Sequence, residues 1–353
     1  MSNKKWSVCF GIITVTILML VGGMTAVVDP FFHYHAPLDV LNYCLDNQRY
    51  QNDGILRHFQ YDAIITGTSQ TENFKTSEFD ALFGTRAVKV PFSGATFKEV
   101  NDGYCSALKR NADIRYVLRS IDGSIILADK DEMSYSESMY PRYLYDDTIL
   151  NDASYLLNKD VFFSNTIITL RYTMRGYETT SFDEYSNWMG DYQFGKEAVD
   201  LTYSRPEKQA ELQKLTDDER KTIHDNLMQN VVSLVEEYPN VEFYLFFPPY
   251  SIYWWDEIQR NGKLGWQIDI FREASEILVE YSNVHLFSFF SDYDLICNLD
   301  YYKDRIHYHE DINSRMLDCM AKDEFRLTKE NYQMHWDEVQ SFFNSYSFDS
   351  WFE

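Results

Sequence analysis

Ser69 lies just after a short apolar segment, residues 61–66, that is followed by Gly67. In an open parallel sheet ligands bind at the carboxyl ends of the strands, and a serine in the following turn can present its hydroxyl there as a nucleophile. Backbone N–H groups at the start of the next helix would stabilise a developing oxyanion. The same serine is also typical of a helix N-cap, because Glu72 follows three residues later. Ser69 alone therefore allows both interpretations.

Asp304 and His307 stand three residues apart near the other end of the sequence, and in a turn both can face one way. A serine nucleophile needs a base to accept its proton, and an acid that fixes the tautomer of that base. Such a pair is weak evidence by itself, because the chain contains 55 Asp and Glu residues. Combined with Ser69 and a run of β/α units between them, the pair indicates a serine-hydrolase triad.

The segments between these residues alternate in a way that predicts how the triad is positioned. The expected strands are residues 61–66, 87–91, 114–120, 241–247 and 284–289, and the expected helices are residues 76–83, 97–110, 217–238 and 267–281. Strands that alternate with helices at short spacing predict a parallel sheet with crossover helices. The fold class is therefore α/β.

Residues 134–205 break this alternation. They are rich in Tyr, Asp, Asn and Ser and show weak periodicity, which indicates an insertion over the carboxyl edge of the sheet. Within this insertion we expect helices near residues 152–157 and 162–172. The α/β domain is expected at residues 61–328, and a C-terminal helical tail at residues 329–353.

The N-terminus predicts a membrane anchor. Residues 6–28 contain no charged side chain and follow Lys4 and Lys5. At a rise of about 1.5 Å per residue they reach about 35 Å, enough to cross a hydrocarbon core of about 30 Å. A cleavable signal peptide is the alternative, although its apolar region is usually about 7–15 residues long. We therefore expect an uncleaved anchor at residues 1–28, a stalk at residues 29–60, and the remainder outside the cytoplasm.

Composition excludes some classes of function. The formal charge of -23 argues against nucleic acid and against adsorption to anionic lipid through a basic face. An apolar fraction of 45% is ample for a folded core. No cofactor is expected.

Cysteine and histidine spacing gives no reason to expect a metal site. The cysteines outside the anchor are Cys44, Cys105, Cys297 and Cys319, which permit two disulfides or remain free thiols. None of them has the spacing of zinc ligands. The alternating histidines, namely His33, His35, His307 and His309, are more typical of ordinary loop composition than of a metal centre.

Three motifs resemble the conserved blocks of SGNH/GDSL-type hydrolases. Gly67-Thr68-Ser69, continued by Gln70-Thr71-Glu72-Asn73, is similar to the first block, and Asp304-Arg305-Ile306-His307 is similar to the last. The Ser93-Gly94 turn falls where that family has its second-block glycine. The resemblance implies a flavodoxin-like three-layer sandwich, with Ser69 as nucleophile, His307 as general base, Asp304 as the orienting acid, and the backbone N–H groups of Ser69 and Gly94 as oxyanion donors.

The sequence departs from the family pattern at two blocks. Thr68 stands where GDSL enzymes have Asp, and no Gly-x-Asn-Asp block is found. The corresponding strand end carries Asp122-Gly123, and an ionised Asp cannot donate a hydrogen bond to an oxyanion. Asn101 or a backbone group is the candidate for the missing donor.

Further residues are candidates for substrate binding. They are Asn73, Asn101, Asp122, Tyr250 and Trp254. The aromatic run at residues 250–255 follows a strand end and could stack on a sugar ring, but packing against the insertion explains it equally well. Trp188 carries the same two interpretations.

The N-terminal anchor resembles the DltD-like and polysaccharide O-acyltransferase branches of the family, which act at the cell envelope. The resemblance implies a serine-dependent acyl esterase or O-acyltransferase that acts on an envelope glycan or related polymer through an acyl-enzyme on Ser69. It also implies a membrane partner protein that donates the acyl group. The alternative is a non-catalytic scaffold that binds a glycan or a membrane partner through the same cleft. A lipase-like role on phospholipids would require an apolar rim beside that cleft.

Overall fold

The computed structural model describes residues 3–136 and 139–352. Residues 1–2 of the predicted anchor, residues 137–138 of the predicted insertion and Glu353 of the predicted tail lie outside the described residues. The chain divides into two compact units. Met1–Gln60 and Tyr135–Tyr185 form the N-terminal unit, and Tyr61–Ser134 and Ser186–Glu353 form the α/β unit.

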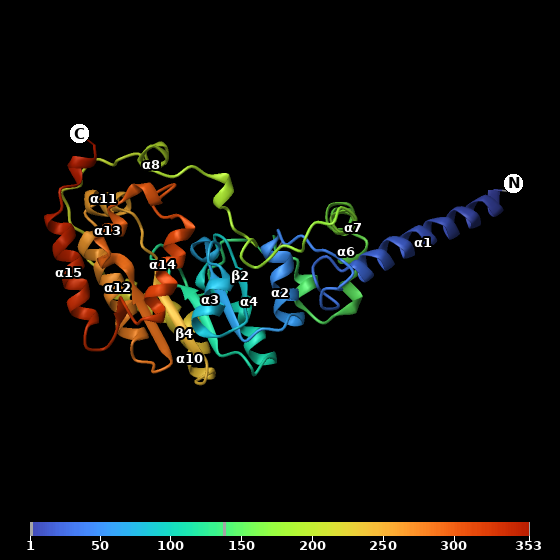
Figure 1. The fold of residues 1–353 in the computed structure, drawn as a ribbon, viewed down its shortest axis with the longest axis horizontal. Helices are drawn as coiled ribbons and strands as arrows, with labels where there is room; N and C mark the ends of the chain where they lie inside the picture. Colours follow the sequence, from blue (N-terminus) through green and yellow to red (C-terminus); the bar gives the residue numbers. More distant parts are fainter. Residues whose placement is uncertain (1–2, 137–138, 353) are drawn as a thin grey trace. The chain divides into compact units, whose positions relative to one another are not determined.

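The N-terminal unit is helical. It contains α1 (Asn3–Val28), α2 (Gln48–His58), α5 (Arg142–Tyr145), the 3-10 turn η3 (Ile149–Asn151), α6 (Ala153–Leu156), the π-helical turn η4 (Val161–Thr166) and α7 (Ile167–Met174). In Figure 1, α6 lies beside the C-terminal end of α1, and α6 and η4 both pack against that helix. By length and composition α1 can cross a membrane, a property that it shares with signal sequences.

Residues 29–60 form part of this unit rather than the stalk expected from the sequence. Phe31, Phe32 and Tyr43 are buried. The ring of Phe31 stacks on that of Tyr155 at 5.7 Å, and Tyr43 accepts a backbone hydrogen bond from Thr180 at 3.0 Å. The aromatic side chains that suggested a stalk therefore form a small core with part of the predicted insertion.

The α/β unit contains one six-stranded sheet in the order β2-β1-β3-β4-β5-β6. The strands are β1 (Ala63–Gly67), β2 (Ala87–Pro91), β3 (Tyr116–Ser120), β4 (Glu242–Phe247), β5 (Val284–Ser288) and β6 (Arg326–Leu327). The first five run parallel, and β6 pairs with β5 in the antiparallel direction. This is the flavodoxin-like order, and it confirms the expected α/β class with a parallel sheet.

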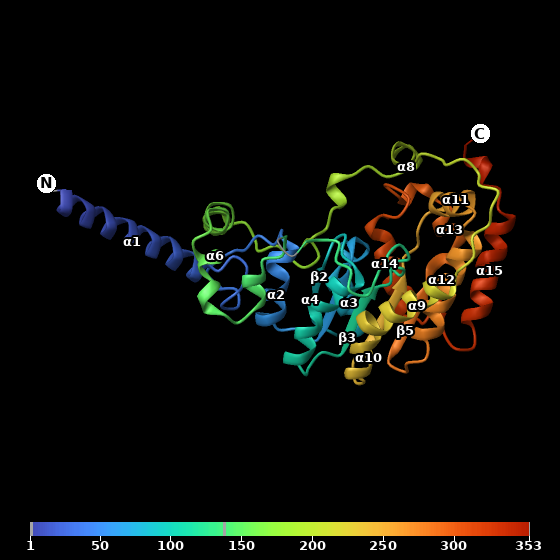
Figure 2. The same cartoon turned by 180° about the vertical axis from the view of Figure 1, so that it is seen from behind.

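Helices cover both faces of this sheet. The unit contains α3 (Thr76–Phe83), α4 (Phe97–Arg110), α8 (Lys196–Thr202), α9 (Asp217–Leu227), η6 (Met228–Val232), α10 (Ser233–Glu237), α11 (Ile252–Arg260), α12 (Leu264–Leu278), α13 (Tyr293–Ile296), α14 (Glu310–Ala321) and α15 (Tyr332–Ser345). The connection from β1 to β2 leads toward the β2 edge of the sheet, whereas the later connections lead toward the β6 edge. Because such crossovers are right-handed, α3 lies on one face, and α4, α9 and α12 lie on the other. Figures 1 and 2 show the unit from opposite sides.

Local signals fix several helix ends where the sequence places them. Thr96 and Glu99 form a capping box at the start of α4. Gly84 ends α3 in the left-handed conformation, with φ of 64°, as its position after the helix predicted. The expected strand at residues 87–91 matches β2.

The predicted C-terminal helical tail contains α15 and packs on the core of the α/β unit. Trp336 and Phe343 on α15 are fully buried, and the indole of Trp336 donates to the Ser275 hydroxyl on α12 at 2.9 Å. The 3-10 turn η9 (Phe348–Trp351) also packs, with Phe348 buried. Apolar side chains on one face of the helix explain this docking.

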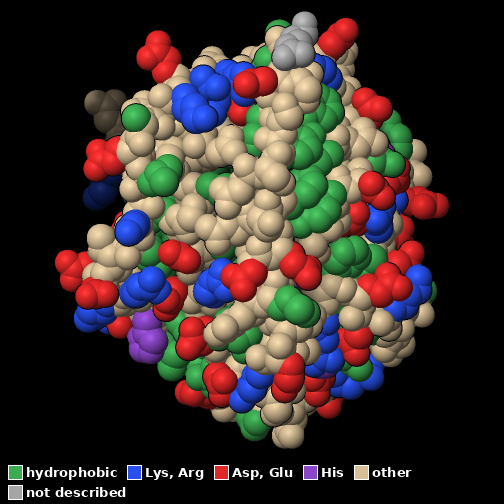
Figure 3. All heavy atoms as spheres, turned by 90° about the vertical axis from the view of Figure 1, so that its left-hand side faces the viewer, with side chains coloured by type: hydrophobic (Ala, Val, Ile, Leu, Met, Phe, Trp, Pro, Cys, Tyr) green, Lys and Arg blue, Asp and Glu red, His purple; other side chains and the backbone are tan. Residues whose placement is uncertain are grey.

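Acidic side chains are spread over the surface of the α/β unit. Figure 3 shows Asp and Glu side chains scattered across one face and interspersed with Lys and Arg. Some form ion pairs, such as that of Glu257 with Arg305. All five cysteines are free thiols, so the structure contains neither of the disulfides that the sequence permitted.

Candidate active site

Ser69 lies in the turn that follows β1. The strand ends at Gly67, whose φ is 142° and at which a Cβ would come within 2.5 Å of the Ser120 hydroxyl oxygen. Only glycine fits this close approach. Ser69 then opens the 3-10 turn η1 (Ser69–Thr71), and the cap of that turn is Thr68, whose hydroxyl accepts from the Gln70 N–H at 3.4 Å. The capping role considered for Ser69 thus belongs to its neighbour.

Ser69, His307 and Asp304 form a continuous chain of hydrogen bonds. Ser69 Oγ lies 2.9 Å from His307 Nε2. On the other side of the ring, His307 Nδ1 lies 2.7 Å from Asp304 Oδ2. This geometry lets the imidazole accept the serine proton while the carboxylate stabilises the resulting imidazolium.

Asp304 is held as a carboxylate. Its Oδ1 accepts the backbone N–H groups of Ile306 and His307, each at 2.9 Å. Partial burial raises its pKa, but the hydrogen bond and charge interaction with His307, together with the backbone N–H groups, outweigh burial and leave the pKa below its ordinary value. Asp304 is therefore ionised at neutral pH.

The loop that carries Asp304 and His307 is fixed by contacts with the end of β4. The carbonyl of Arg305 accepts the Ser251 N–H and hydroxyl, each at 2.9 Å. Tyr302 donates its hydroxyl to the Pro249 carbonyl at 2.7 Å. These contacts limit movement of the loop, which keeps the imidazole in reach of Ser69.

Asp122 supports the serine turn from inside the protein. It accepts hydroxyl hydrogen bonds from Ser120 at 2.7 Å, Thr68 at 3.0 Å and Tyr250 at 3.3 Å. Burial raises its pKa, although these three hydroxyls lower it in part. Asp122 and Tyr250, which the sequence placed among the substrate-binding candidates, are buried at 4% and 1% exposure and belong to the interior beneath the turn.

The other predicted binding residues are buried too. Trp254 is buried and stacks on Phe290, which follows β5, with an interplanar angle of 7°, so it packs within the α/β unit and this contact is not with the insertion. Asn101 lies on α4, and its Oδ1 has no hydrogen-bond partner among the described residues. Asn73 accepts the Trp188 N–H at 3.3 Å and so positions the segment beside the triad.

An aromatic wall lines the triad, and the sequence signal for it was ambiguous. The ring of Trp188 meets that of His307 edge to face at 5.8 Å, and Phe194 stacks on Trp188. Lys303 Nζ lies over the rings of Trp188 and Tyr192, at 4.1 and 3.5 Å from their centroids. Burial lowers the pKa of Lys303. The close spacing of three aromatics at residues 188–194 was the signal that could have identified this wall.

The predicted oxyanion donors lie at two neighbouring strand ends. Ser69 follows β1, and Gly94, which is exposed and has φ of 67°, follows β2. Among the described residues neither backbone N–H has a hydrogen-bond partner. Binding of an oxyanion between them stays a prediction.

The sequence matches no protein-family model and no curated protein. A solved structure from Streptococcus pneumonia, described provisionally as a platelet activating factor, is similar over 78% of this chain and 90% of its own, with 12% identity and a TM-score of 0.40. A likeness at this level carries no argument about activity. The assignment of the fold rests on the strand order.

Proposed function

We propose that the protein is a serine-dependent acyl esterase or O-acyltransferase that acts through an acyl-enzyme on Ser69. The observation that supports this best is the hydrogen-bonded chain from Ser69 Oγ through His307 to Asp304, with distances of 2.9 and 2.7 Å. A helix cap would need neither the histidine nor the carboxylate.

The reaction would proceed in two halves. Ser69 Oγ attacks the acyl carbonyl while its proton passes to His307 Nε2, and the Ser69 and Gly94 N–H groups would bind the oxyanion. Collapse breaks the bond to the leaving alcohol, which takes the proton from His307. Water or an acceptor hydroxyl then attacks the acyl-enzyme and gives its proton to His307, which passes the proton to Ser69 Oγ as the bond between that oxygen and the acyl group breaks. The triad serves hydrolysis and transfer equally.

The aromatic wall favours an acylated glycan or related polymer as substrate. Trp188 is partly exposed and Tyr192 is 52% exposed, and flat rings beside a catalytic serine suit the apolar faces of sugars. A membrane partner protein that donates the acyl group is an expectation by analogy alone.

We also propose that α1 stays attached as a single-pass anchor with both units outside the cytoplasm. Gly22, Thr25 and Val28 are buried in the N-terminal unit, and the Asp29 N–H donates to the Thr25 carbonyl at 2.7 Å. Cleavage would remove packed residues from the unit. Amino-terminal analysis of the membrane-bound protein tests this, and a mature chain that begins after Val28 would contradict it.

Trapping of the acyl-enzyme tests the activity. The full-length protein in detergent is mixed with p-nitrophenyl acetate, quenched in acid and mapped by peptide mass spectrometry. We expect an acetyl group on Ser69 and none in Ser69→Ala. Ser93→Ala, which changes a serine at the neighbouring strand end, is the matched control and should still be acetylated on Ser69.

A non-catalytic scaffold is the second candidate function. The observation that favours it is the buried position of Asp122 at the strand end where the family has its third block, so no side chain there replaces the missing donor. The scaffold predicts unchanged glycan binding in Ser69→Ala and no acetylation of the wild type.

A further inference from the structure

A groove in the N-terminal unit is separate from the triad. Its volume is about 800 Å³, one wall is α1 between Val15 and Gly23, and the other is formed by η3 and α6, residues 149–157. Apart from Tyr34 and Asp152, the residues that line it are apolar.

The groove wall is apolar where it meets solvent. Ile149 and Leu150 are 81% and 93% exposed, and Leu157 is 44% exposed. Adjacent apolar side chains at such exposure are unfavourable in water and mark a surface that contacts another apolar phase. The wall continues directly into the exposed apolar surface of α1, which includes Leu18 and Met19.

The position of the groove residues along α1 indicates that this apolar phase is the membrane interior. A hydrocarbon core of about 30 Å takes up about 20 residues of helix. Counted from Trp6, the first residue after the lysines, the core extends to about Thr25. Val15 to Gly23 therefore lie in the half of the bilayer nearer the N-terminal unit, at the depth of lipid acyl chains.

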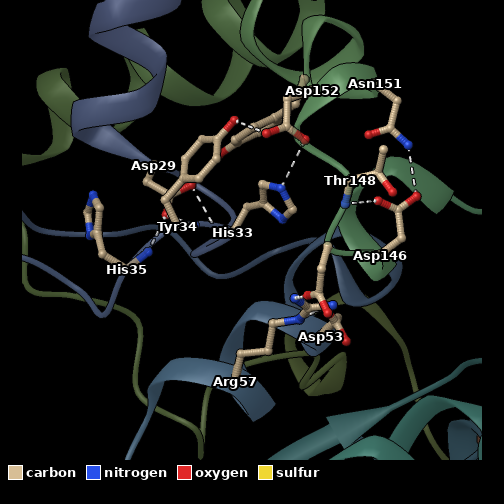
Figure 4. A network of polar contacts seen from close by, with 12 residues as sticks. Asp29, His33, Tyr34, His35, Asp53, Arg57, Asp146, Thr148, Asn151 and Asp152 are labelled. Carbon is tan, nitrogen blue, oxygen red and sulfur yellow. Dashed lines mark hydrogen bonds and ion pairs between the residues drawn. The ribbon is translucent and has the colours of Figure 1, made fainter.

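The polar lining of the groove consists of Tyr34, which is half-buried, and Asp152, which is buried. Figure 4 shows Tyr34, whose hydroxyl donates to Asp152 Oδ2 at 2.8 Å, and His33, whose Nε2 lies 3.3 Å from Asp152 Oδ1. Asp29 fixes this segment by accepting the backbone N–H groups of Tyr34 and His35 at 2.7 and 3.1 Å. The Asp152 side chain is 5% exposed and retains acceptor capacity. A carboxylate at this point favours a hydroxyl donor and repels phosphate.

We propose that this groove binds one acyl chain of a membrane lipid whose head presents a hydroxyl group, with the hydroxyl beside Tyr34 and Asp152. The site goes beyond the proposed acyl transfer and depends on α1 remaining in the membrane. The groove orders a lipid against the anchor, whereas bulk lipid contacts α1 only transiently.

The test is photolabelling of full-length protein in detergent micelles with trace diacylglycerol that carries a diazirine in one acyl chain. We expect saturable labelling, competed by unlabelled diacylglycerol, on peptides that cover residues 15–23 and 149–157. Phosphatidic acid with the same photoactivatable chain replaces the hydroxyl by phosphate and should label at least about fivefold less, a difference of about 1 kcal/mol. Equal labelling by both lipids would overturn the proposed hydroxyl preference.

Two glycines of α1 provide matched variants. A Cβ at Gly23 or at Gly11 would meet no described atom within 4 Å beyond its own stretch of helix, and of these two glycines it is Gly23 that lines the groove. Gly23→Trp should fill the groove and remove the saturable labelling, whereas Gly11→Trp should keep it. Labelling that is non-saturable, or unchanged in Gly23→Trp, would overturn the proposal.

Two substitutions of exposed leucines provide a second test in case the glycine variants misfold. Leu150→Asn changes a groove residue that is 93% exposed. Leu201→Asn makes the same change outside the groove, at a residue of the α/β unit that is 88% exposed. Only Leu150→Asn should weaken the labelling, and equal effects would contradict the proposal. Acetylation of Ser69 should persist in all four variants, so failure of the lipid site is distinguishable from failure of the proposed activity.

Discussion

Among the His–Asp pairs of the protein, His307–Asp304 in the α/β unit and His33–Asp152 in the N-terminal unit have contrasting surroundings. In the α/β unit His307 lies 2.7 Å from Asp304 and presents its other nitrogen to Ser69 at 2.9 Å. In the N-terminal unit His33 lies 3.3 Å from Asp152, and its Nδ1 is buried without a hydrogen-bond partner among the described residues. The third group, more than the pair itself, distinguishes the two.

The two pairs also differ in solvent exposure, and the pair beside Ser69 is the more exposed one. The side chains of His307 and Asp304 are 20% and 25% exposed, whereas those of His33 and Asp152 are 7% and 5% exposed. Each histidine also meets an aromatic ring edge to face, Trp188 at 5.8 Å and Tyr155 at 5.7 Å. Trp188 is partly exposed and Tyr155 is fully buried. Similar local contacts therefore serve an accessible site in one unit and a packed network in the other.

The largest expected effect contrasts the two histidines. His307→Ala removes the base and should lower kcat/KM for p-nitrophenyl acetate about 1,000-fold or more. His33→Ala should leave kcat/KM unchanged, because that ring contacts no nucleophile. Both values come from steady-state hydrolysis by folded protein, checked by circular dichroism. A comparable loss of kcat/KM in both variants would contradict the assignment of His307, and not His33, as the base.

The second-largest expected effect is a difference in kcat between variants of the two aspartates. Asp304→Asn keeps the shape but favours the wrong tautomer of His307, so kcat should fall about 100-fold or more. Asp152→Asn should keep kcat and lower the Tm, because it weakens the contacts with Tyr34 and His33. Measurement of kcat and Tm for both variants tests this prediction. A loss of kcat in Asp152→Asn but not in Asp304→Asn would show that Asp152, and not Asp304, supports the reaction.

The rings beside the histidines should have separable effects. Trp188→Ala should raise KM for acylated sugars several-fold, since a stacking surface contributes on the order of 1 kcal/mol. Tyr155→Phe removes the hydroxyl that donates to Asp29 Oδ1 at 2.7 Å, and should reduce unfolding stability by about 1–3 kcal/mol with KM unchanged. An unchanged KM in Trp188→Ala would remove the ring from the substrate site.

The smallest expected effect is on the pH dependence of stability. The folded-state pKa of Asp304 is lowered, so its contribution to stability is fully present above the ordinary carboxyl pKa of 3.8 and is lost as pH falls through the folded value. The Tm difference between wild type and Asp304→Asn should therefore shrink below about pH 4. Thermal unfolding at several pH values measures it, and a difference that grows in acid would contradict the assigned pKa direction.

The sequence predicted the sheet well because the buried strands leave a strong local pattern. Residues 87–91 and 97–110 match β2 and α4, since apolar runs, caps and glycine stops act locally. The partners of residues 29–60 and of α15 depend instead on contacts between distant segments, such as Phe31 with Tyr155, which no local pattern encodes.

The same division holds at the site. Ser69, Asp304 and His307 were recognisable as a candidate triad because a serine nucleophile, its base and its acid require those residue types, and hydrogen bonds join the three in the structure. Their catalytic role stays a prediction. Burial of a side chain was harder to predict: Asp122 carries a polar group at a strand end, but three hydroxyls enclose it inside the protein. Trp188 lies beside His307 only because the chain returns there after the N-terminal unit.

Labelling with a fluorophosphonate probe measures whether Ser69 is an activated nucleophile. The reagent bonds only to a serine that a neighbouring base has activated, so full-length protein, Ser69→Ala and His307→Ala are compared, with the labelled peptide identified by mass spectrometry. The wild type should be labelled at Ser69, and both variants should lose the labelling. Folded wild type that stays unlabelled, or labelling that survives in Ser69→Ala, would contradict this prediction.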